Sequence, residues 1–311
     1  MISSIIGSVN SLLLIIVVGI YAGKKHIISK NGNKVLINLI LNVTLPVLIV
    51  NSFISGNTEE VRANVLTALY ISVLIFVVEI AFSYLLLFPV KGREWTILQF
   101  SNIFPNTGYV GFPLLLLLYG SAGVVYGSIY NMLMNLLTWS YGVFLFEKAS
   151  GKTKDKQNVL ALFKNPNLVA VYIGLALMFA DVQIPAAILS TTGMIAGITG
   201  PLSMLAIGVT MTTISYRNKF TNLKLYYGMV TRMIIIPLVT IMVVRQFNIE
   251  FNLVTRSLLV ITAMPTATIT SILAEKYEFE NDFATVLVVF TTVMTVFTAP
   301  LIIQLIENLA S

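Results

Sequence analysis

Cysteine is absent from this chain of 311 residues, and histidine occurs once, at His26. The absence of cysteine excludes disulfide bonds, thiolate metal sites, cysteine nucleophiles and lipid attachment through cysteine. A single histidine leaves too few nitrogen ligands for a transition-metal centre, so no cofactor is expected. Charged residues are also scarce, at 10% of the chain, whereas 57% of the residues are hydrophobic and the mean hydropathy is +0.90. This balance predicts an integral membrane protein.

The net charge of +6 does not indicate a nucleic-acid partner, because most lysines and arginines lie in short loops that follow alternate apolar segments. Loops enriched in this way face the cytoplasm in proteins that cross the membrane several times. The pattern therefore predicts a lipid bilayer as the surroundings of the chain, namely the inner or plasma membrane. It also predicts that both termini are extracytoplasmic.

Ten apolar segments predict an all-α membrane protein with ten transmembrane helices. In chain order, the predicted helices are Ser4–Ala22, Val35–Ser55, Asn64–Phe88, Trp95–Tyr119, Ala122–Phe146, Asn167–Ala180, Ile188–Tyr216, Leu225–Phe247, Leu253–Ala274 and Asp282–Glu307. No basic stretch precedes the first segment, which is therefore interpreted as a retained helix and not as a signal peptide.

The chain divides almost in half at a lysine-rich stretch, GKTKDK, which is its only linker-like sequence. We therefore expect a first five-helix repeat at residues 1–147, a cytoplasmic linker at 148–166 and a second five-helix repeat at 167–311. Because five is odd, the two repeats enter the membrane from opposite faces. This arrangement is an inverted repeat of the kind found in secondary transporters.

Proline interrupts the fourth and the ninth predicted helix, at Pro105 in NIFPNTGYVGFP and at Pro265 in MPTAT. Each proline removes a backbone donor and disturbs the preceding turn, and freed backbone groups in lipid must bind protein or trapped water. One such break has an ordinary structural explanation, because proline and glycine are frequent in membrane helices. Two breaks at corresponding places, both with polar neighbours, indicate a transporter binding site.

The half-helices that begin at these breaks offer unpaired N–H groups and about half a positive charge, which favours an anion. The half-helices that end there present carbonyl groups, which suit Na⁺ or a proton. For the asparagines, hydrogen bonding between helices is an equally good explanation. The candidate substrate-binding residues are Asn102, Pro105, Asn106, Thr107, Gly108, Asn131, Asn135, Pro265, Thr266 and Thr268.

Two charged residues lie well inside predicted helices at similar depth, Glu79 in the third helix and Arg232 in the eighth. A charge at that depth is costly and is a functional candidate. Three hypotheses compete: an ion pair that holds the repeats together, attraction of a substrate carboxylate by Arg232, and proton or cation coupling through Glu79. Snorkelling of the side chains to the membrane surface is the fourth alternative.

The sequence resembles the auxin efflux carrier family, whose bacterial members are often described as malate or malonate permeases. The motifs NTGYVGFPL, KNPNLVAVYIGLAL, PLSMLAIGVTM and AMPTATITSILAEKYEF carry the resemblance, which covers essentially the whole chain. The family implies two inverted five-helix repeats, broken fourth and ninth helices that cross near the bilayer midplane, and a substrate site at the crossing. The long cytoplasmic loop of the plant exporters is missing here, so their control by phosphorylation is not carried over.

We therefore expect a carrier, and not an enzyme, that moves a small organic anion by alternating access. A Na⁺- or H⁺-coupled symporter of the bile-acid type is the alternative, followed by a channel or a membrane sensor without transport. A hydrolase lacks acid, base and nucleophile residues in mid-membrane, and the glycines of TGYVGFP lack the Lys-Ser/Thr of a phosphate-binding loop. The substrate, the direction of transport, the coupling ion and the oligomeric state, including a homodimer, stay open.

Overall fold

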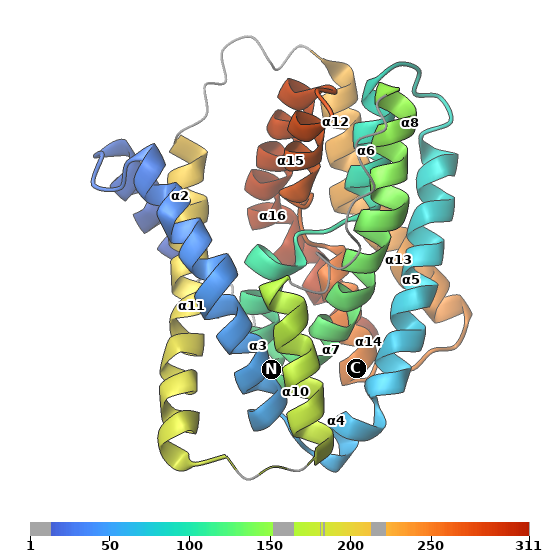
Figure 1. Cartoon of the computed structure of the whole chain (residues 1–311). Helices are drawn as coiled ribbons and strands as arrows, with labels where there is room; N and C mark the ends of the chain where they lie inside the picture. Colours follow the sequence, from blue (N-terminus) through green and yellow to red (C-terminus); the bar gives the residue numbers. More distant parts are fainter. Residues whose placement is uncertain (1–13, 152–164, 181, 183, 213–221, 311) are drawn as a thin grey trace. The chain divides into compact units, whose positions relative to one another are not determined.

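The computed structural model describes residues 14–151, 165–180, 182, 184–212 and 222–310 (Figure 1). This part of the chain is helical and contains no strand apart from one isolated bridge between Pro105 and Thr266. The predicted all-α class is confirmed. Residues 4–13 of the first predicted helix and 152–164 of the predicted linker lie outside the described residues.

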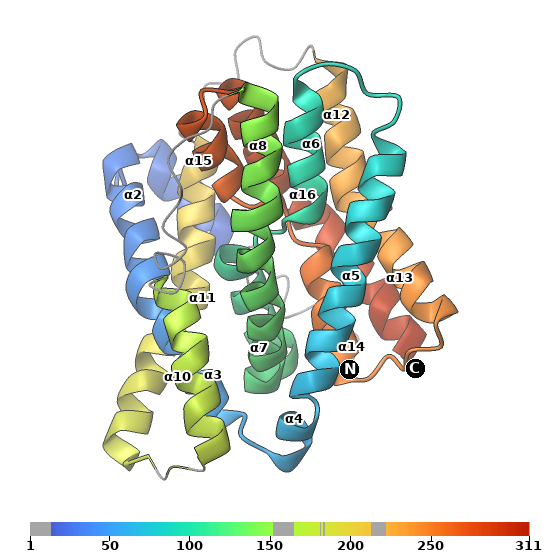
Figure 2. The same ribbon diagram turned by 45° about the vertical axis from the view of Figure 1, so that its right-hand side comes forward.

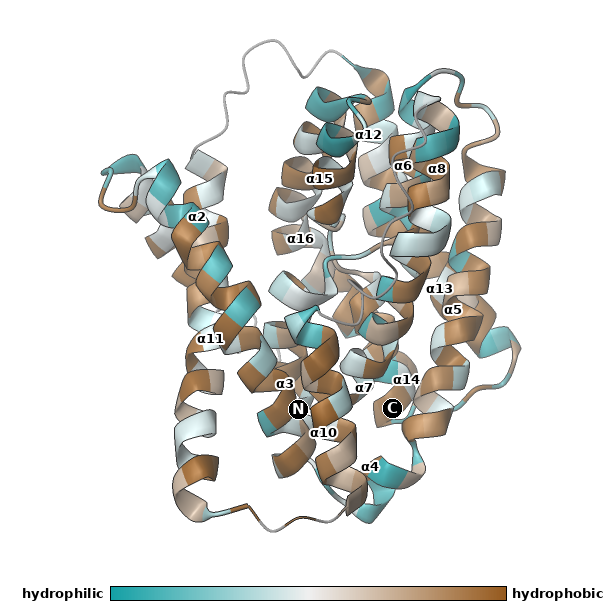
Figure 3. Cartoon of the chain, viewed as in Figure 1, coloured by the Kyte–Doolittle hydropathy of each residue, from teal (hydrophilic) through white to brown (hydrophobic). Residues whose placement is uncertain are grey.

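Six helical stretches of the described chain are long and apolar enough to cross a membrane: Lys30–Ser55, Val65–Leu86, Thr107–Ser150, Ala186–Thr212, Leu223–Gln246 and Asn281–Ala310. Shorter apolar helices cover Leu14–Lys24, Pro166–Ala180 and Leu253–Thr262. Apolar residues cover much of α5 (Val65–Leu86) and α11 (Ala186–Thr212), whereas hydrophilic residues gather on the short helix α4 (Glu59–Ala63), as Figure 3 shows. The chain is therefore a multi-pass membrane protein; the count of ten helices stays a prediction.

A helical stretch that is interrupted at Gly120 covers parts of two of the predicted helices. It consists of η2 (Thr107–Gly111), α7 (Phe112–Leu137), η3 (Thr138–Gly142) and α8 (Val143–Ser150), where η denotes a π-helical turn. The stretch bends at Gly120, whose φ of 65° lies in the region that glycine adopts without steric cost. The bend falls between the predicted helices Trp95–Tyr119 and Ala122–Phe146.

The chain forms two compact units, and each draws on both halves of the sequence. The first comprises residues 1–69, 108–132 and 160–214, and the second comprises residues 70–107, 133–159 and 215–311. Their boundaries therefore differ from those of the predicted repeats, which stay a prediction.

In the first unit, α3 (Leu45–Ser55) packs between α10 (Pro166–Ala180) and α11 (Figure 1). It continues α2 (Lys30–Leu39) and η1 (Ile40–Thr44), and this long helix runs antiparallel to α11. Three polar contacts join the two in one constant register: Asn33 with Thr210 at 2.8 Å, Thr199 with the carbonyl of Thr44 at 3.2 Å, and Thr192 with Asn51 at 3.0 Å. Such bonds hold helices together where lipid offers no hydrophobic driving force.

Glycine permits a backbone contact on the other side of α11. A Cβ atom built on Gly208 would lie 2.2 Å from the carbonyl oxygen of Ile16 and 2.8 Å from the Cα of Gly19, in the helix Leu14–Lys24. Any side chain at this position would separate the two helices. This is the small-residue packing that is typical of membrane helices.

The second unit contains α6 (Glu94–Ile103), α12 (Leu223–Val230), η4 (Thr231–Ile235), α13 (Ile236–Gln246), α14 (Leu253–Thr262), α15 (Ile269–Lys276) and α16 (Asn281–Ala310), together with most of α5. Helix α6 lies beside α12 in both views (Figures 1 and 2), and α16 contacts α12, α14 and α15. These elements surround the two proline breaks.

Ion pairs tie together the loops at one end of the second unit. Lys224 lies 2.9 Å from Glu94 and also donates to the carbonyl of Lys91 at 2.6 Å. Arg93 pairs with Glu280 at 2.9 Å and stacks over the ring of Phe279. These contacts join the first turns of α6 and α12 and the loops before α6 and α16, in the region that the charge pattern predicts to be cytoplasmic.

Candidate functional site

The helix breaks predicted at Pro105 and Pro265 are present, and the two broken segments bind each other. Helix α6 ends at Ile103 and α14 ends at Thr262. The N–H of Asn106 donates to the carbonyl of Pro265 at 2.7 Å, and the N–H of Ala267 donates to the carbonyl of Phe104 at 3.0 Å. The backbone groups freed by one proline are thus satisfied by the segment around the other, as an apolar environment demands.

A new helix begins directly after each bridging segment. η2 begins at Thr107, and α15 begins at Ile269 with Thr268 as its N-cap. The side chain of Thr268 is exposed and does not cap α15. The N–H groups of Thr270 and Ser271 donate to the carbonyls of Ala267 and Thr268, at 3.0 and 3.2 Å. An N-terminus of this kind carries partial positive charge and attracts anions.

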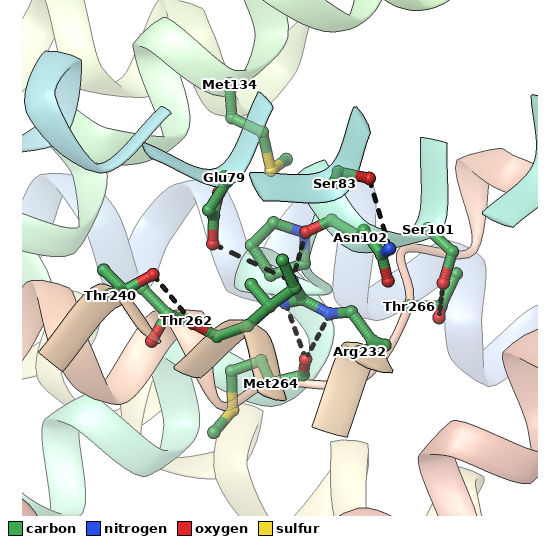
Figure 4. A network of polar contacts seen from close by, with 12 residues as sticks. Glu79, Ser83, Ser101, Asn102, Met134, Arg232, Thr240, Thr262, Met264 and Thr266 are labelled. Atoms are coloured by element: carbon green, nitrogen blue, oxygen red, sulfur yellow. Dashed lines mark hydrogen bonds and ion pairs between the residues drawn. The ribbon is translucent and has the colours of Figure 1, made fainter. Parts of the chain in front are cut away.

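Arg232, in η4, binds the opposite, carbonyl-bearing ends of the broken helices. Its Nη1 donates to the carbonyl of Asn102, in the last turn of α6, at 2.9 Å. Its Nε and Nη2 donate to the carbonyl of Met264, just past the end of α14, at 3.2 and 2.8 Å. One guanidinium therefore neutralises the partial negative charge of both helix ends (Figure 4).

Glu79 faces the same guanidinium from α5. Its Oε1 lies 3.8 Å from Nη1 of Arg232, and both side chains are fully buried (Figure 4). The burial excludes the snorkelling alternative, because neither charge reaches a membrane surface. The two residues belong to the same compact unit, and their charges offset each other in a place where a lone charge would be very costly.

Asn102 is held by a one-way chain of hydrogen bonds. Thr231 donates to its Oδ1 at 3.2 Å, and its Nδ2 donates to Ser83 at 3.1 Å. Ser83 donates to Gln99 at 2.8 Å, and the amide of Gln99 donates to Tyr141 at 3.2 Å. Both polar atoms of the Asn102 side chain are therefore bonded to neighbouring side chains. These bonds hold Asn102 in place, and with it the backbone carbonyl that Arg232 binds.

Two hydroxyl contacts fix the second broken segment. The hydroxyl of Thr266 lies 2.6 Å from that of Ser101, and the N–H of Thr266 donates to Thr291 at 3.2 Å.

Thr107 donates to the sulfur of Met134 at 3.3 Å. A thioether is a weak acceptor, so the hydroxyl of Thr107 loses little by turning to another partner.

Sequence reasoning missed several members of this network: Ser83, Gln99, Ser101, Thr231 and Thr291. One signal was available, because Ser83 follows Glu79 by one helical turn and shares its face. The contacts of the others run between segments distant in sequence, which a hydropathy pattern does not reveal.

The predicted substrate residues are divided between the two compact units. Asn102, Pro105, Asn106, Thr107, Asn135, Pro265, Thr266 and Thr268 fall in the second unit, whereas Gly108 and Asn131 fall in the first. Asn102 and Thr266 are fully buried and bonded to neighbours, Asn106 and Asn131 are buried, Asn135 is half-buried and Thr268 is exposed. Acidic or histidine residues grouped to hold a metal do not occur in the described part of the chain.

Apolar helices long enough to span a membrane, together with two shorter helices that end beside prolines and whose following segments pair with each other, are typical of helical membrane transporters with discontinuous helices. Residues 4–303 match the family model described as "Membrane transport protein", so the chain belongs to that family. The resemblance to the auxin efflux carriers is thereby confirmed.

The chain is similar to several proteins described as uncharacterized transporters. YfdV of Escherichia coli is 25% identical over 311 residues, which cover 97% of each chain. A transporter of Methanocaldococcus jannaschii is 24% identical over 283 residues, or 86% of this chain and 88% of the relative. A third, from Methanothermobacter thermautotrophicus, is 25% identical over 213 residues, or 68% of each chain.

Proposed function

We propose that the protein is a secondary transporter that carries a small organic anion, a carboxylate, across the cell membrane by alternating access. The observation that carries the proposal is the backbone pairing of Asn106 with Pro265, which fixes the start of two half-helices at one place. A carboxylate accepts hydrogen bonds from N–H groups and hydroxyls at a helix N-terminus without a basic side chain. Membership of a transporter family supports the same function.

Within this proposal the candidate residues have two roles. Asn106, Thr107, Gly108 and Thr268, at or beside the starts of η2 and α15, bind the anion, and the amides of Asn131 and Asn135 line its route. Asn102, Pro105, Pro265 and Thr266 shape the backbone. This second role is supported by the bonds of Asn102 to Ser83 and of Thr266 to Ser101.

The membrane arrangement that goes with this function has two inverted five-helix repeats and both termini extracytoplasmic. The bound anion moves when one helix bundle shifts against the other. A homodimer is compatible with the proposal and is not required by it. A channel is disfavoured, since filters are generally built with rotational symmetry or rings of charge, and this chain offers neither.

Counterflow in vesicles tests the proposal. The purified protein is reconstituted and loaded in turn with malate, malonate and indole acetate, and uptake of the same labelled anion is followed. We expect saturable exchange of at least one carboxylate and none of a neutral analogue such as glycerol. Absence of saturable flux for every carboxylate, in vesicles that contain correctly folded protein, would rule out the substrate class.

A further inference from the structure

Three oxygen ligands from three different elements converge on the guanidinium of Arg232. The carbonyl of Asn102 belongs to the last turn of α6, the carbonyl of Met264 follows α14, and the carboxylate of Glu79 comes from α5. Helix C-termini and unwound carbonyls at such breaks are the groups with which discontinuous membrane helices bind cations. A carboxylate close by completes an oxygen set for a monovalent cation.

The guanidinium of Arg232 occupies the place between these oxygens. Three of its nitrogens donate to the two carbonyls at 2.8 to 3.2 Å, and its side chain is fully buried. A guanidinium does not lose its proton in proteins, so its charge is permanent. A positive charge therefore occupies the site in the absence of any solute ion.

We infer that these three oxygens form a cation site that the protein fills with its own Arg232, so that the carrier binds and moves its anion without a coupling Na⁺ or proton. The inference rests on the proposed function for its transport part and on the geometry alone for its binding part. It removes the symporter alternative and leaves an anion carrier driven by the gradient and charge of its substrate.

Removal of the guanidinium exposes the latent site. Arg232→Ala leaves the Glu79 carboxylate and two helix C-termini buried without their counter-charge, which is costly in a membrane protein. The same truncation leaves space where the guanidinium stood. A small cation that enters it stabilises the folded protein by mass action, whereas a cation too large to enter does not.

The binding part is tested by thermal unfolding of the purified protein in detergent. Millimolar guanidinium, Na⁺ and choline are added as chloride salts at equal ionic strength. For Arg232→Ala we expect guanidinium or Na⁺, but not choline, to raise the unfolding midpoint by roughly 2–4 °C at several times the dissociation constant. The wild type should show no difference among the three salts.

Two further variants are matched controls. Arg245→Ala removes an exposed arginine from α13, close in sequence to Arg232, and should respond to no cation. Arg232→Ala combined with Glu79→Gln removes the buried negative charge as well, and should lose the cation-dependent shift. Folded Arg232→Ala that is indifferent to every small cation would overturn the site.

The transport part is tested by counterflow of the anion that the wild type exchanges. Replacement of Na⁺ by choline and collapse of the pH gradient should leave wild-type exchange unchanged, whereas exchange by Arg232→Ala should be low and restored in part by guanidinium. Arg232→Lys keeps a cationic group beside Glu79 and serves if Arg232→Ala does not fold; its exchange should stay independent of Na⁺. Wild-type exchange that requires Na⁺ or a proton gradient contradicts the inference but leaves the proposed carrier intact. Absence of any exchange contradicts the proposed carrier, and the cation site is then decided by the unfolding experiment.

Discussion

The N–H of Asn106 donates to the carbonyl of Pro265, 159 positions later in the sequence, at 2.7 Å. The segment around each proline supplies the carbonyl that accepts a hydrogen bond from an N–H of the other segment. Neither break is therefore tolerable in an apolar environment without the other, because unpaired backbone groups in lipid cost several kcal/mol each. The pairing fixes where the next helices begin, and the candidate anion site depends on that position.

Thr268→Ala should weaken substrate binding and leave the fold intact. The hydroxyl of Thr268 is exposed at the N-terminus of α15, and a hydrogen bond to a charged group contributes about 1.5–3 kcal/mol, equivalent to a loss of affinity of roughly tenfold to a hundredfold. The half-saturation concentration in counterflow measures the effect. Thr285→Ala, at an exposed site in α16, is the matched control and should leave that concentration unchanged.

If Thr268→Ala leaves the half-saturation concentration unchanged, the hydroxyl of Thr268 does not bind the substrate. A rise of equal size for Thr285→Ala would instead point to a general effect on the reconstituted protein.

Asn102→Ala and Ser83→Ala should destabilise the second unit less in combination than the sum of their separate effects. The two side chains share a fully buried hydrogen bond at 3.1 Å, and each variant leaves the partner's polar atom without it, at a cost of about 1–3 kcal/mol. The double variant leaves no such atom at this bond. Thermal unfolding of the four proteins gives the coupling. Additive losses would show that the bond contributes nothing of its own.

Hydropathy and charge were sufficient to predict the class of protein. Proline with polar neighbours indicated the breaks at Pro105 and Pro265, whereas Pro201 and Pro300 lie inside α11 and α16. The predicted helix Leu225–Phe247 agrees with the stretch Leu223–Gln246 within two residues at either end, because lipid forces long apolar segments to be helical. The break at Pro265 was predictable for a different reason: proline has no N–H to continue the helix, and threonines rather than a long apolar run follow it.

The carbonyl partners of Arg232 were not predictable. Its depth suggested a functional charge, but its donors go to the carbonyls of Asn102 and Met264, and every residue has a carbonyl. The composition of the compact units was equally hidden, because helix packing pairs segments from both halves of the chain. Both depend on side-chain geometry, which the one-dimensional pattern does not contain.

Gly208→Ala should destabilise the first unit, whereas Gly193→Ala in the same helix should not. A Cβ atom added at Gly208 would lie 2.2 Å from the carbonyl oxygen of Ile16, a backbone atom that cannot move away as a flexible side chain can. A Cβ atom added at Gly193 would have nothing within 4 Å. Alanine at Gly193 should even stabilise α11, by up to about 1 kcal/mol, through its higher helix propensity. Thermal unfolding measures both. Equal midpoints for the two variants would contradict the close contact with the helix Leu14–Lys24.

Thiol labelling should show that α4, which contains Glu60, and the loop that contains Lys91 lie on opposite faces of the membrane. Because the chain has no cysteine, a single cysteine introduced at Glu60, in α4, or at Lys91, before α6, is the only target for a reagent. The excess of lysine and arginine in alternate loops predicts that Lys91 faces the cytoplasm. In intact cells a membrane-impermeant maleimide should therefore label Glu60→Cys and spare Lys91→Cys, and permeabilised cells should label both. Labelling of Lys91→Cys alone in intact cells would reverse the predicted orientation and place both termini in the cytoplasm.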